Sequence, residues 1–188
     1  SSNNILSPAD GRPITSPTQD MVLGIFHLSA AREGSVGEGR AFASVAEAIM
    51  AYDSHTLSLQ APITVRLTGY TSVDNGKKAE PWTGPEDWTP GDPVLVQTTL
   101  GRCLLNEALP EDYRFVNYEV TKKELGAIVN DLAERYPNNT LLAKFAAVLV
   151  RWADELAHAL RQLDRRDPGW RNDPGFYPPD AGPETAGG

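Results

Sequence analysis

The sequence is poor in the residues that build disulfides, metal centres and membrane anchors. It holds one cysteine, Cys103, and three histidines, which excludes an internal disulfide and a multi-cysteine metal site. A small buried hydrophobic role suits Cys103 better than a reactive thiol. The chain shows no secretion signal and no apolar run long enough to span a bilayer. We therefore expect a cytoplasmic protein without membrane contact.

A surplus of positive charge is also missing. Seventeen Lys and Arg residues stand against 25 Asp and Glu, which gives a formal net charge of −8. Autonomous nucleic-acid-binding domains normally carry a basic face, so this balance argues against that class. The hydrophobic content of 40% over 188 residues still suffices for one core and a tail.

The common catalytic motifs are absent as well. The histidines His27, His55 and His158 are scattered, and no zinc-protease, serine-hydrolase or Cys-x-x-Cys pattern accompanies them. The glycine-rich segment 29–40 has no preceding strand and no following Gly-Lys-Ser/Thr, which disfavours a phosphate-binding loop. The histidines are best explained as surface or packing residues.

What is present predicts an α+β fold. Helical periodicity marks residues 41–52, 122–136 and 141–163. The first two have capping boxes, Ser44 with Glu47 and Thr121 with Glu124, and Thr140 is a candidate N-cap for the third. Apolar side chains share one side of each helix: Val45, Ala48, Ile49 and Tyr52; Leu125, Ile128, Val129 and Leu132; and a broad stripe from Leu142 to Leu163 that would pack on helix 122–136.

Turn residues dominate the opening. Asp10-Gly11 predicts a small hairpin over residues 4–15. A helix is then predicted through the apolar run 21–26. Ser16 would be its N-cap, Pro17 its first residue, and Asp20 would lie in its first turn.

Alternation marks two strands. Residues 57–67 alternate strictly, with Pro62 indicating an edge or a bulge, and residues 94–99 form the pairing strand. Between them Asn75-Gly76 is a hairpin signal. Trp82 and Trp88 in this loop suit either a ligand platform or, preferably, the cover of a small core.

Two separated segments resemble the β′ subunit of bacterial RNA polymerase. The first is SSNNILSP with Gly11, Pro13, Ile14, Pro17, Gln19, Asp20 and Val22–Gly24. The second is TTLGR followed by Leu105-Asn106-Glu107 and Leu109-Pro110. In addition, the segment VNDLAERYP resembles actinobacterial members of this family. In that family the first segment follows the catalytic aspartate loop and enters the wall of the secondary channel, or pore.

The resemblance implies an organisation. Residues 1–137 would form the pore-like domain, 138–166 a long helix packed on the preceding helix, and 167–188 a Pro/Gly-rich disordered tail. The expected architecture is a small antiparallel β-sheet with packed helices and a C-terminal helical hairpin.

Catalysis by that family depends on three aspartates that hold Mg²⁺. No closely spaced triad occurs here: Asp10 and Asp20 are isolated, and Asp164 and Asp167 lie near a helix end. We therefore expect no catalytic residue, no metal ligand and no cofactor in this chain, with Mg²⁺ belonging to the intact polymerase. An independent enzyme is disfavoured.

The resemblance also implies site residues. Gln19, Asp20 and Arg102 would face nucleotide or RNA along the wall. The alternatives are that Asp20 caps a helix while Gln19 is merely solvated, and that Arg102 is a structural ion-pair partner.

Lys122, Lys123 and Glu124 would lie on the rim helix that binds partners. Those partners are other polymerase subunits and secondary-channel-binding transcription factors, with nucleic acid contacted only within the intact enzyme. One hypothesis is a fragment or paralogue of the pore domain. The other is a stand-alone mimic that binds polymerase-directed factors or inhibitors.

Overall fold

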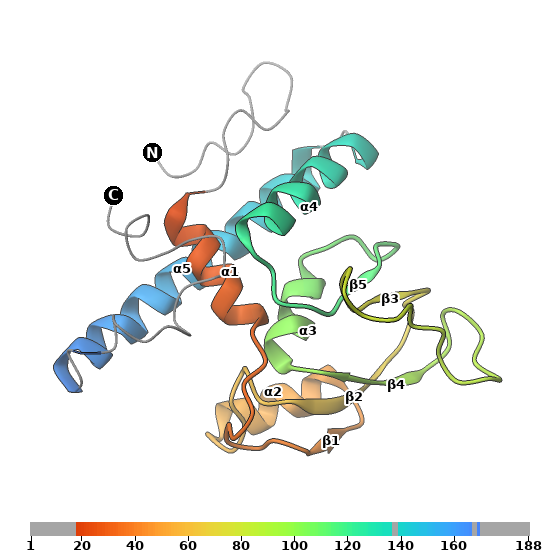
Figure 1. Cartoon of the computed structure of the whole chain (residues 1–188), viewed down its shortest axis with the longest axis horizontal. Helices are drawn as coiled ribbons and strands as arrows, with labels where there is room; N and C mark the ends of the chain where they lie inside the picture. Colours follow the sequence, from red (N-terminus) through yellow and green to blue (C-terminus); the bar gives the residue numbers. More distant parts are fainter. Residues whose placement is uncertain (1–17, 137–138, 167–168, 170–188) are drawn as a thin grey trace. The chain divides into compact units, whose positions relative to one another are not determined.

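The computed structural model describes residues 18–136, 139–166 and 169. The element order is α1 (Gln19–Ser29), β1 (Ala41–Phe42), α2 (Val45–Asp53), β2 (Ile63–Leu67), β3 (Val73–Asp74), β4 (Val94–Thr98), α3 (Leu100–Glu107), β5 (Phe115–Val116), α4 (Lys122–Arg135) and α5 (Asn139–Arg166) (Figure 1). This order confirms the α+β class. The hairpin predicted at 4–15 and nearly all of the predicted tail lie outside the described residues.

The chain divides into two compact units. We call Leu28–Glu119 the sheet unit; the remaining described residues, 18–27, 120–136, 139–166 and 169, form the helical unit. The boundary predicted from the resemblance at residue 137 stays a prediction.

The sheet unit holds a mixed sheet rather than the antiparallel one expected. Its strand order is β1-β2-β4, with β1 parallel and β4 antiparallel to the central β2. Strand β2 begins only at Ile63, because a turn in which the Ala61 N–H donates to the Ser58 carbonyl (3.3 Å) precedes it. Pro62 therefore stands before the central strand, and its missing N–H costs no ladder hydrogen bond. On the side expected to face inward, Leu57, Ala61, Ile63, Val65 and Leu67 are buried, and Leu59 is half-buried.

The hairpin predicted at Asn75-Gly76 is wrong. Strand β3 pairs in parallel with β5, about forty residues further along the chain, instead of with a neighbour. The turn signal itself is real, since Gly76 has φ +94° and its N–H donates to Asp74 Oδ1 at 2.9 Å. A local turn was mistaken for the end of a hairpin.

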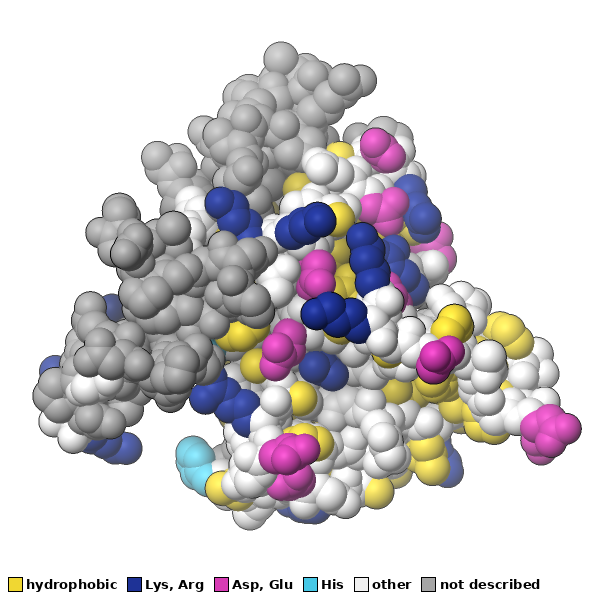
Figure 2. All heavy atoms as spheres, viewed as in Figure 1, with side chains coloured by type: hydrophobic (Ala, Val, Ile, Leu, Met, Phe, Trp, Pro, Cys, Tyr) yellow, Lys and Arg dark blue, Asp and Glu magenta, His cyan; other side chains and the backbone are white. Residues whose placement is uncertain are grey.

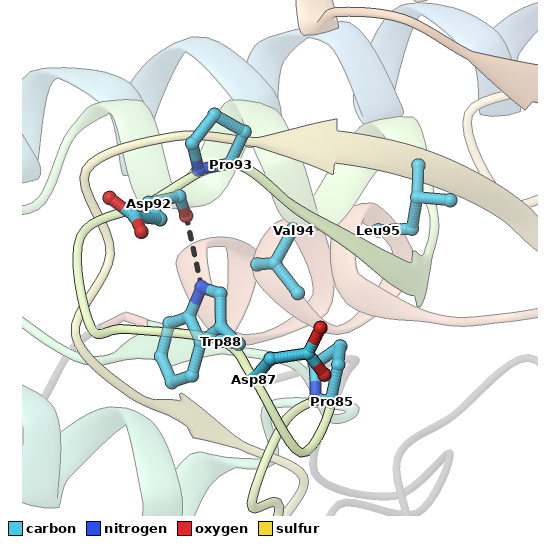
Figure 3. Close-up of a pocket in the computed structure, with 7 residues that line it drawn as sticks. All are labelled: Pro85, Asp87, Trp88, Asp92, Pro93, Val94 and Leu95. Carbon is cyan, nitrogen blue, oxygen red and sulfur yellow. Dashed lines mark hydrogen bonds between the residues drawn. The ribbon is translucent and has the colours of Figure 1, made fainter.

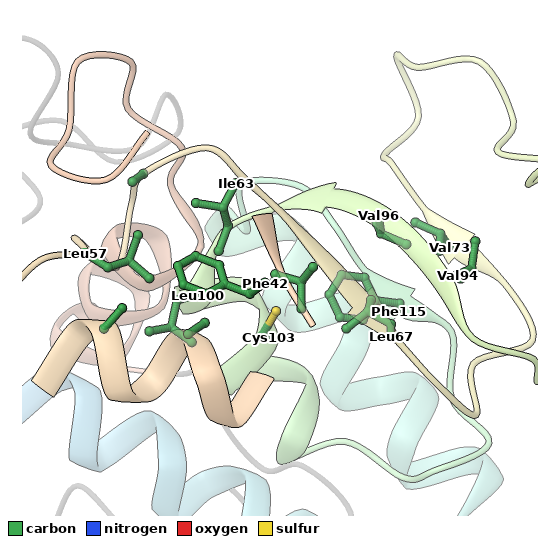
Figure 4. Packing of buried hydrophobic residues seen from close by; sticks show 14 residues of the cluster. Phe42, Leu57, Ile63, Leu67, Val73, Val94, Val96, Leu100, Cys103 and Phe115 are labelled. Carbon is green, nitrogen blue, oxygen red and sulfur yellow. The ribbon is translucent and has the colours of Figure 1, made fainter. Parts of the chain in front are cut away.

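The core of the sheet unit lies between the sheet and helices α2 and α3 (Figure 4). Helix α2 begins at Val45, not at residue 41, because Ala41–Phe42 form β1. Its capping box is confirmed: Ser44 Oγ accepts from Glu47 N at 3.1 Å, and Glu47 Oε2 accepts from Ala43 N at 2.6 Å. Tyr52, predicted on the apolar face, is exposed, and Ala51 is buried instead.

In the helical unit, α1 is capped by Thr18: its Oγ1 accepts from Met21 N at 3.3 Å, so the cap is not the predicted Ser16. Helix α4 has the predicted capping box, with Thr121 N donating to Glu124 Oε2 at 3.2 Å, and it buries the four predicted apolar residues.

Helix α5 packs on α4 as predicted and buries Leu142, Phe145 and Leu149. It begins at Asn139, so Thr140 lies inside the helix rather than capping it. Within the described residues, no helix is both long and apolar enough to cross a membrane.

Candidate functional site

Arg102 lies in the first turn of α3, which Thr99 caps by accepting from Arg102 N at 3.2 Å. Its guanidinium reaches two distant segments: Nε donates to the Ser29 carbonyl at 2.8 Å, and Nη1 donates to the Asn117 carbonyl at 3.4 Å and to its Oδ1 at 3.3 Å. These acceptors are all neutral. Arg102 thus joins three segments of the sheet unit through the backbone.

The charge of Arg102 is incompletely compensated. Burial lowers the pKa of its guanidinium, with the negative charge of Glu119 acting in the opposite direction. Among the described residues, no carboxylate pairs directly with Arg102. A partly buried cation that has only neutral hydrogen-bond partners favours any anion that can reach it.

Two buried asparagines support this arrangement, and sequence reasoning missed both. Asn106 imitates a strand partner: its Oδ1 accepts from Val116 N at 2.7 Å, while its Nδ2 donates to the Val116 carbonyl at 2.9 Å and to the Arg102 carbonyl at 2.7 Å. Asn117 donates to the Gln97 carbonyl at 2.9 Å and to Asn75 Oδ1 at 2.8 Å. Apart from the Arg102 carbonyl, which is four residues from Asn106, the partners lie 10 to 42 residues away, and no local pattern encodes such contacts.

A close backbone approach fixes α3 against the end of α1. A side chain at Gly101 would overlap the Leu28 carbonyl oxygen, so only glycine fits there. The Gly101 N–H also donates to the Leu59 carbonyl at 3.0 Å. The glycine of the Thr-Thr-Leu-Gly-Arg segment therefore sets the position from which Arg102 projects.

A pocket of about 380 Å³ opens beside Arg102, at the end of the sheet where β2 begins and β4 ends. Its lining residues come from the loop after α1, from β2, from β4 and from α3: Ala31, Glu38, Gly39, Pro62, Ile63, Thr64, Gln97, Thr98 and Arg102. All of them belong to the sheet unit. The pocket therefore joins the predicted site residue Arg102 to polar residues that the sequence did not single out as neighbours.

Thr98 is the unusual member of this lining. Its side chain is 4% exposed, and its buried Oγ1 has no hydrogen-bond partner in the described part of the chain. A buried hydroxyl without a partner costs roughly 1–3 kcal/mol. The hydroxyl lies inside the wall, on the buried face of β4, and is not exposed to the pocket.

Gln19 and Asp20 form the first turn of α1 in the helical unit. Asp20 is exposed, a favourable place for a carboxylate at a helix N-terminus. Gln19 is half-buried, and its Nε2 has no hydrogen-bond partner among the residues described. The predicted contact of these residues with nucleotide or RNA stays a prediction.

Lys122, Lys123 and Glu124 form the first turn of α4. Both lysines are exposed, whereas Glu124 closes the capping box. On the face shown in Figure 2, Lys and Arg side chains gather around α4 with Asp and Glu among them. Such a mixed surface suits a protein partner better than a nucleic-acid backbone.

The tryptophans pack against the core cluster, in line with the preferred interpretation. Trp82 and Trp88 stack edge to face at 4.9 Å and pack against the core cluster, and Trp88 Nε1 donates to the Asp92 carbonyl at 3.0 Å (Figure 3). A shallow pocket of about 300 Å³ flanks Trp88. Cys103 is buried as expected, and burial raises the pKa of its thiol to about 12, which makes it unreactive near neutral pH.

Within the described ranges, no group of three His, Cys, Asp or Glu side chains is placed to hold a metal ion. Among the histidines, His27 contacts Phe26 edge to face and His55 is an exposed loop residue with φ +62°. The described residues thus present a pocket beside Arg102.

Comparison with known proteins gives a consistent family. The family model described as RNA polymerase Rpb1, domain 3, matches residues 4–153. The DNA-directed RNA polymerase subunit beta′ of Salinispora tropica is 61% identical over 143 residues, which cover 76% of this chain and 11% of that protein. The corresponding subunit of Acidothermus cellulolyticus is 64% identical over 137 residues, covering 73% of this chain and 10% of the relative.

The chain spans about a tenth of the length of these relatives. The match includes α1, the sheet, Arg102 with its pocket, α4 and the first half of α5, as far as residue 153. The resemblance of the two separated segments is thereby confirmed: the chain belongs to the β′ subunit family of DNA-directed RNA polymerase, in the region of Rpb1 domain 3.

Proposed function

We propose that this chain forms part of the wall of the channel through which nucleotides reach the active centre of an RNA polymerase, and that it does not polymerise alone. The observation that carries the proposal is the family match, which includes both separated segments apart from the first three residues. The cross-linked backbone around Arg102 supports it, because a channel wall has to hold its shape against moving ligands. Mg²⁺ would be held by another part of the enzyme.

Within this role, Gln19, Asp20 and Arg102 would face nucleotide or RNA. Gln19 offers an amide whose Nε2 has no partner in the described residues, and Arg102 offers a cation with only neutral partners. The first turn of α4, with exposed Lys122 and Lys123, would contact other polymerase subunits or factors that enter the channel.

Co-purification tests the partner. The tagged 188-residue chain is incubated with polymerase core subunits and, separately, with channel-binding factors. We expect capture of core subunits, reduced at least several-fold by the charge reversal K122E/K123E. The exposed pair in K77E/K78E is the matched control, since it makes the same charge change in a loop of the sheet unit.

The alternative function gives a different result. A stand-alone mimic would capture channel-binding factors and leave core subunits unbound. Capture of neither class, by a chain whose circular dichroism shows it folded, would overturn both proposals. RNA synthesis by the isolated chain with Mg²⁺ and nucleoside triphosphates would contradict the non-catalytic role.

A further inference from the structure

We propose that the open edge of strand β4, together with the pocket beside Trp88, is a docking site for an extended, basic segment of another protein. The segment would add a strand to β4 and place an Arg or Lys side chain over the Trp88 ring. This inference goes beyond the channel role and does not depend on it, because all of its evidence lies at one edge of the sheet unit.

Strand β4 has a neighbouring strand on one side only, since the sheet order β1-β2-β4 places it at an edge. In an antiparallel ladder, opposite residues alternate between hydrogen-bonded pairs and pairs whose backbone groups point away from each other. Thr64, which stands opposite Gln97, donates its N–H to the Arg40 carbonyl on the β1 side at 2.9 Å, so this pair is of the second kind. Leu95 is two residues from Gln97, so its N–H and C=O also point away from β2.

The backbone groups of Leu95 are therefore open to a new strand. Among the described residues, neither group has a hydrogen-bond partner. Gln97 differs, because Asn117 Nδ2 donates to its carbonyl at 2.9 Å. The edge is thus closed by a side chain at Gln97 and open at Leu95, where one residue of an added strand can exchange two hydrogen bonds with it.

The pocket of about 300 Å³ beside Trp88 lies along the same edge. Val94 and Leu95 both line it, although neighbouring strand residues point to opposite faces. Because β2 occupies the other edge, a pocket that both residues reach has to lie at the open one. In Figure 3 the Val94 side chain points towards Trp88, whereas Leu95 points away from it. A partner residue next to the one paired with Leu95 would therefore direct its side chain to the Val94 face, where the indole ring lies.

The lining of the pocket indicates the chemistry of the partner. Trp88 packs against the core cluster and also lines the pocket, and Leu95 is 57% exposed. Asp87 and Asp92 are exposed members of the lining, to which no Lys, Arg or His of the described residues belongs. Arg66, which stands opposite Leu95 in the register, is not among the lining residues. An aromatic ring beside carboxylates favours a cation whose aliphatic stem packs on the ring, so charge complementarity selects a basic segment.

A second copy of this chain fits the edge less well. Pairing of two β4 edges would bring Asp87 and Asp92 of one copy towards the same carboxylates of the other, and like charges repel. The two occupants also differ in a measurable way, because pairing of copies depends on protein concentration and needs no added segment.

The experiment adds the end-blocked peptide TVTVRVT to the full chain and follows amide hydrogen exchange by NMR. We expect the exchange of the Leu95 amide to slow at least about tenfold at saturation. The Val94 and Val96 amides already belong to the ladder with β2 and should stay unchanged. Replacing the peptide's Arg by Gln should weaken binding about threefold, and replacing it by Glu about tenfold.

The opposing results are equally definite. Absence of saturable binding of all three peptides would overturn the docking site, and equal affinities would overturn the basic character of the partner. A Leu95 amide that stays unprotected at saturating peptide would overturn strand addition. Protection that rises with protein concentration in the absence of peptide would assign the edge to a second copy instead.

Variants separate the backbone contact from the charge contact, with binding measured by the fluorescence anisotropy of a labelled peptide. Leu95→Pro removes the outward N–H without costing a ladder hydrogen bond, and we expect it to weaken binding at least about fivefold. Leu95→Thr keeps the N–H and is the matched control. D87N/D92N should weaken binding of the Arg peptide about fivefold and leave the Gln peptide unaffected. Its control is E80Q/E111Q, which neutralises two exposed carboxylates of the sheet unit outside the pocket.

The acidic variant keeps the test decisive if Leu95→Pro does not fold, because Asp87 and Asp92 are exposed. Equal losses in D87N/D92N and E80Q/E111Q would show a non-specific charge effect and contradict the site. Because the titration uses the chain and a peptide alone, its failure is distinguishable from failure to capture polymerase subunits.

Discussion

The sheet unit and the helical unit are held together by different forces. In the sheet unit, polar side chains bind backbone groups of distant segments: the buried Asn106 binds Val116 and the half-buried Arg102 binds Ser29. In the helical unit, apolar residues pack between helices, with Leu125, Leu132 and Phe145 all at most 1% exposed. Polar contacts fix direction as well as distance, whereas apolar contacts depend mainly on area and shape.

The difference matters for where a binding site can form. A pocket keeps its geometry only if its walls are positioned by contacts that specify direction. The pocket beside Arg102 lies in the sheet unit, where such contacts concentrate. Substitutions in both units test this contrast.

The largest loss is expected for Gly101→Ala in the sheet unit. The new methyl group would overlap the Leu28 carbonyl, and both sides of the contact are backbone, so neither can turn away. We expect a destabilisation of more than about 3 kcal/mol, with loss of the near-ultraviolet circular dichroism of Trp82 and Trp88. Gly126→Ala is the control, since nothing lies within 4 Å of its added Cβ. Wild-type stability in Gly101→Ala would mean that this approach is not a fixed feature of the fold.

The contact at Gly101 also illustrates which features can be predicted from the sequence and which cannot. Both capping boxes were found because a cap and its partner lie three residues apart, inside the window that local reasoning surveys. The contact of Gly101 with Leu28 joins residues more than seventy positions apart, and no periodicity in the sequence indicates it.

The predictions of strand length and strand pairing were wrong for the same reason. Alternation ran on through the turn at Ser58–Ala61, so residues 57–67 looked like one strand although β2 begins at Ile63. Whether Val73–Asp74 pairs with a neighbour or with Phe115 is decided by the whole chain. Arg102 was selected by resemblance, but its pocket partners Glu38 and Thr64 are brought to it only by folding.

The second prediction removes a polar contact of the sheet unit. Asn106→Leu keeps the size of the side chain but leaves the buried Val116 N–H and C=O without their partner. We expect a destabilisation of about 3 kcal/mol, measured by urea unfolding. Asn130→Leu on the exposed side of α4 is the control, expected within about 0.5 kcal/mol of wild type. Equal effects of the two substitutions would remove the contrast between polar and apolar stabilisation.

The third prediction applies the glycine test to the helical unit. A Cβ at Gly24 would stand 2.8 Å from Ala153 N and 2.9 Å from Ala153 Cα, so α1 and α5 would have to separate slightly. Helices can shift against an apolar interface, and alanine also favours a helix over glycine by about 1 kcal/mol. We expect a net loss of about 1–2 kcal/mol, seen in the helical signal at 222 nm, with Gly126→Ala instead gaining about 0.5–1 kcal/mol. A loss in Gly24→Ala as large as that in Gly101→Ala would show that the helical unit is equally rigid.

The smallest effect is expected for the ion pair between Arg114 and Asp74 on the surface of the sheet unit. Arg114 Nε lies 2.9 Å from Asp74 Oδ2, with the two side chains 32% and 33% exposed. Water and salt screen such a pair, so a double-mutant cycle of Asp74→Asn and Arg114→Gln should give a coupling of about 0.5–1 kcal/mol that decreases in 0.5 M salt. Asp74→Asn retains an oxygen for the Gly76 N–H, so the turn at that position survives the substitution. A coupling above about 2 kcal/mol that is insensitive to salt would mean that direct charge pairing also stabilises this unit. In that case its rigidity would not come chiefly from neutral hydrogen bonds to the backbone.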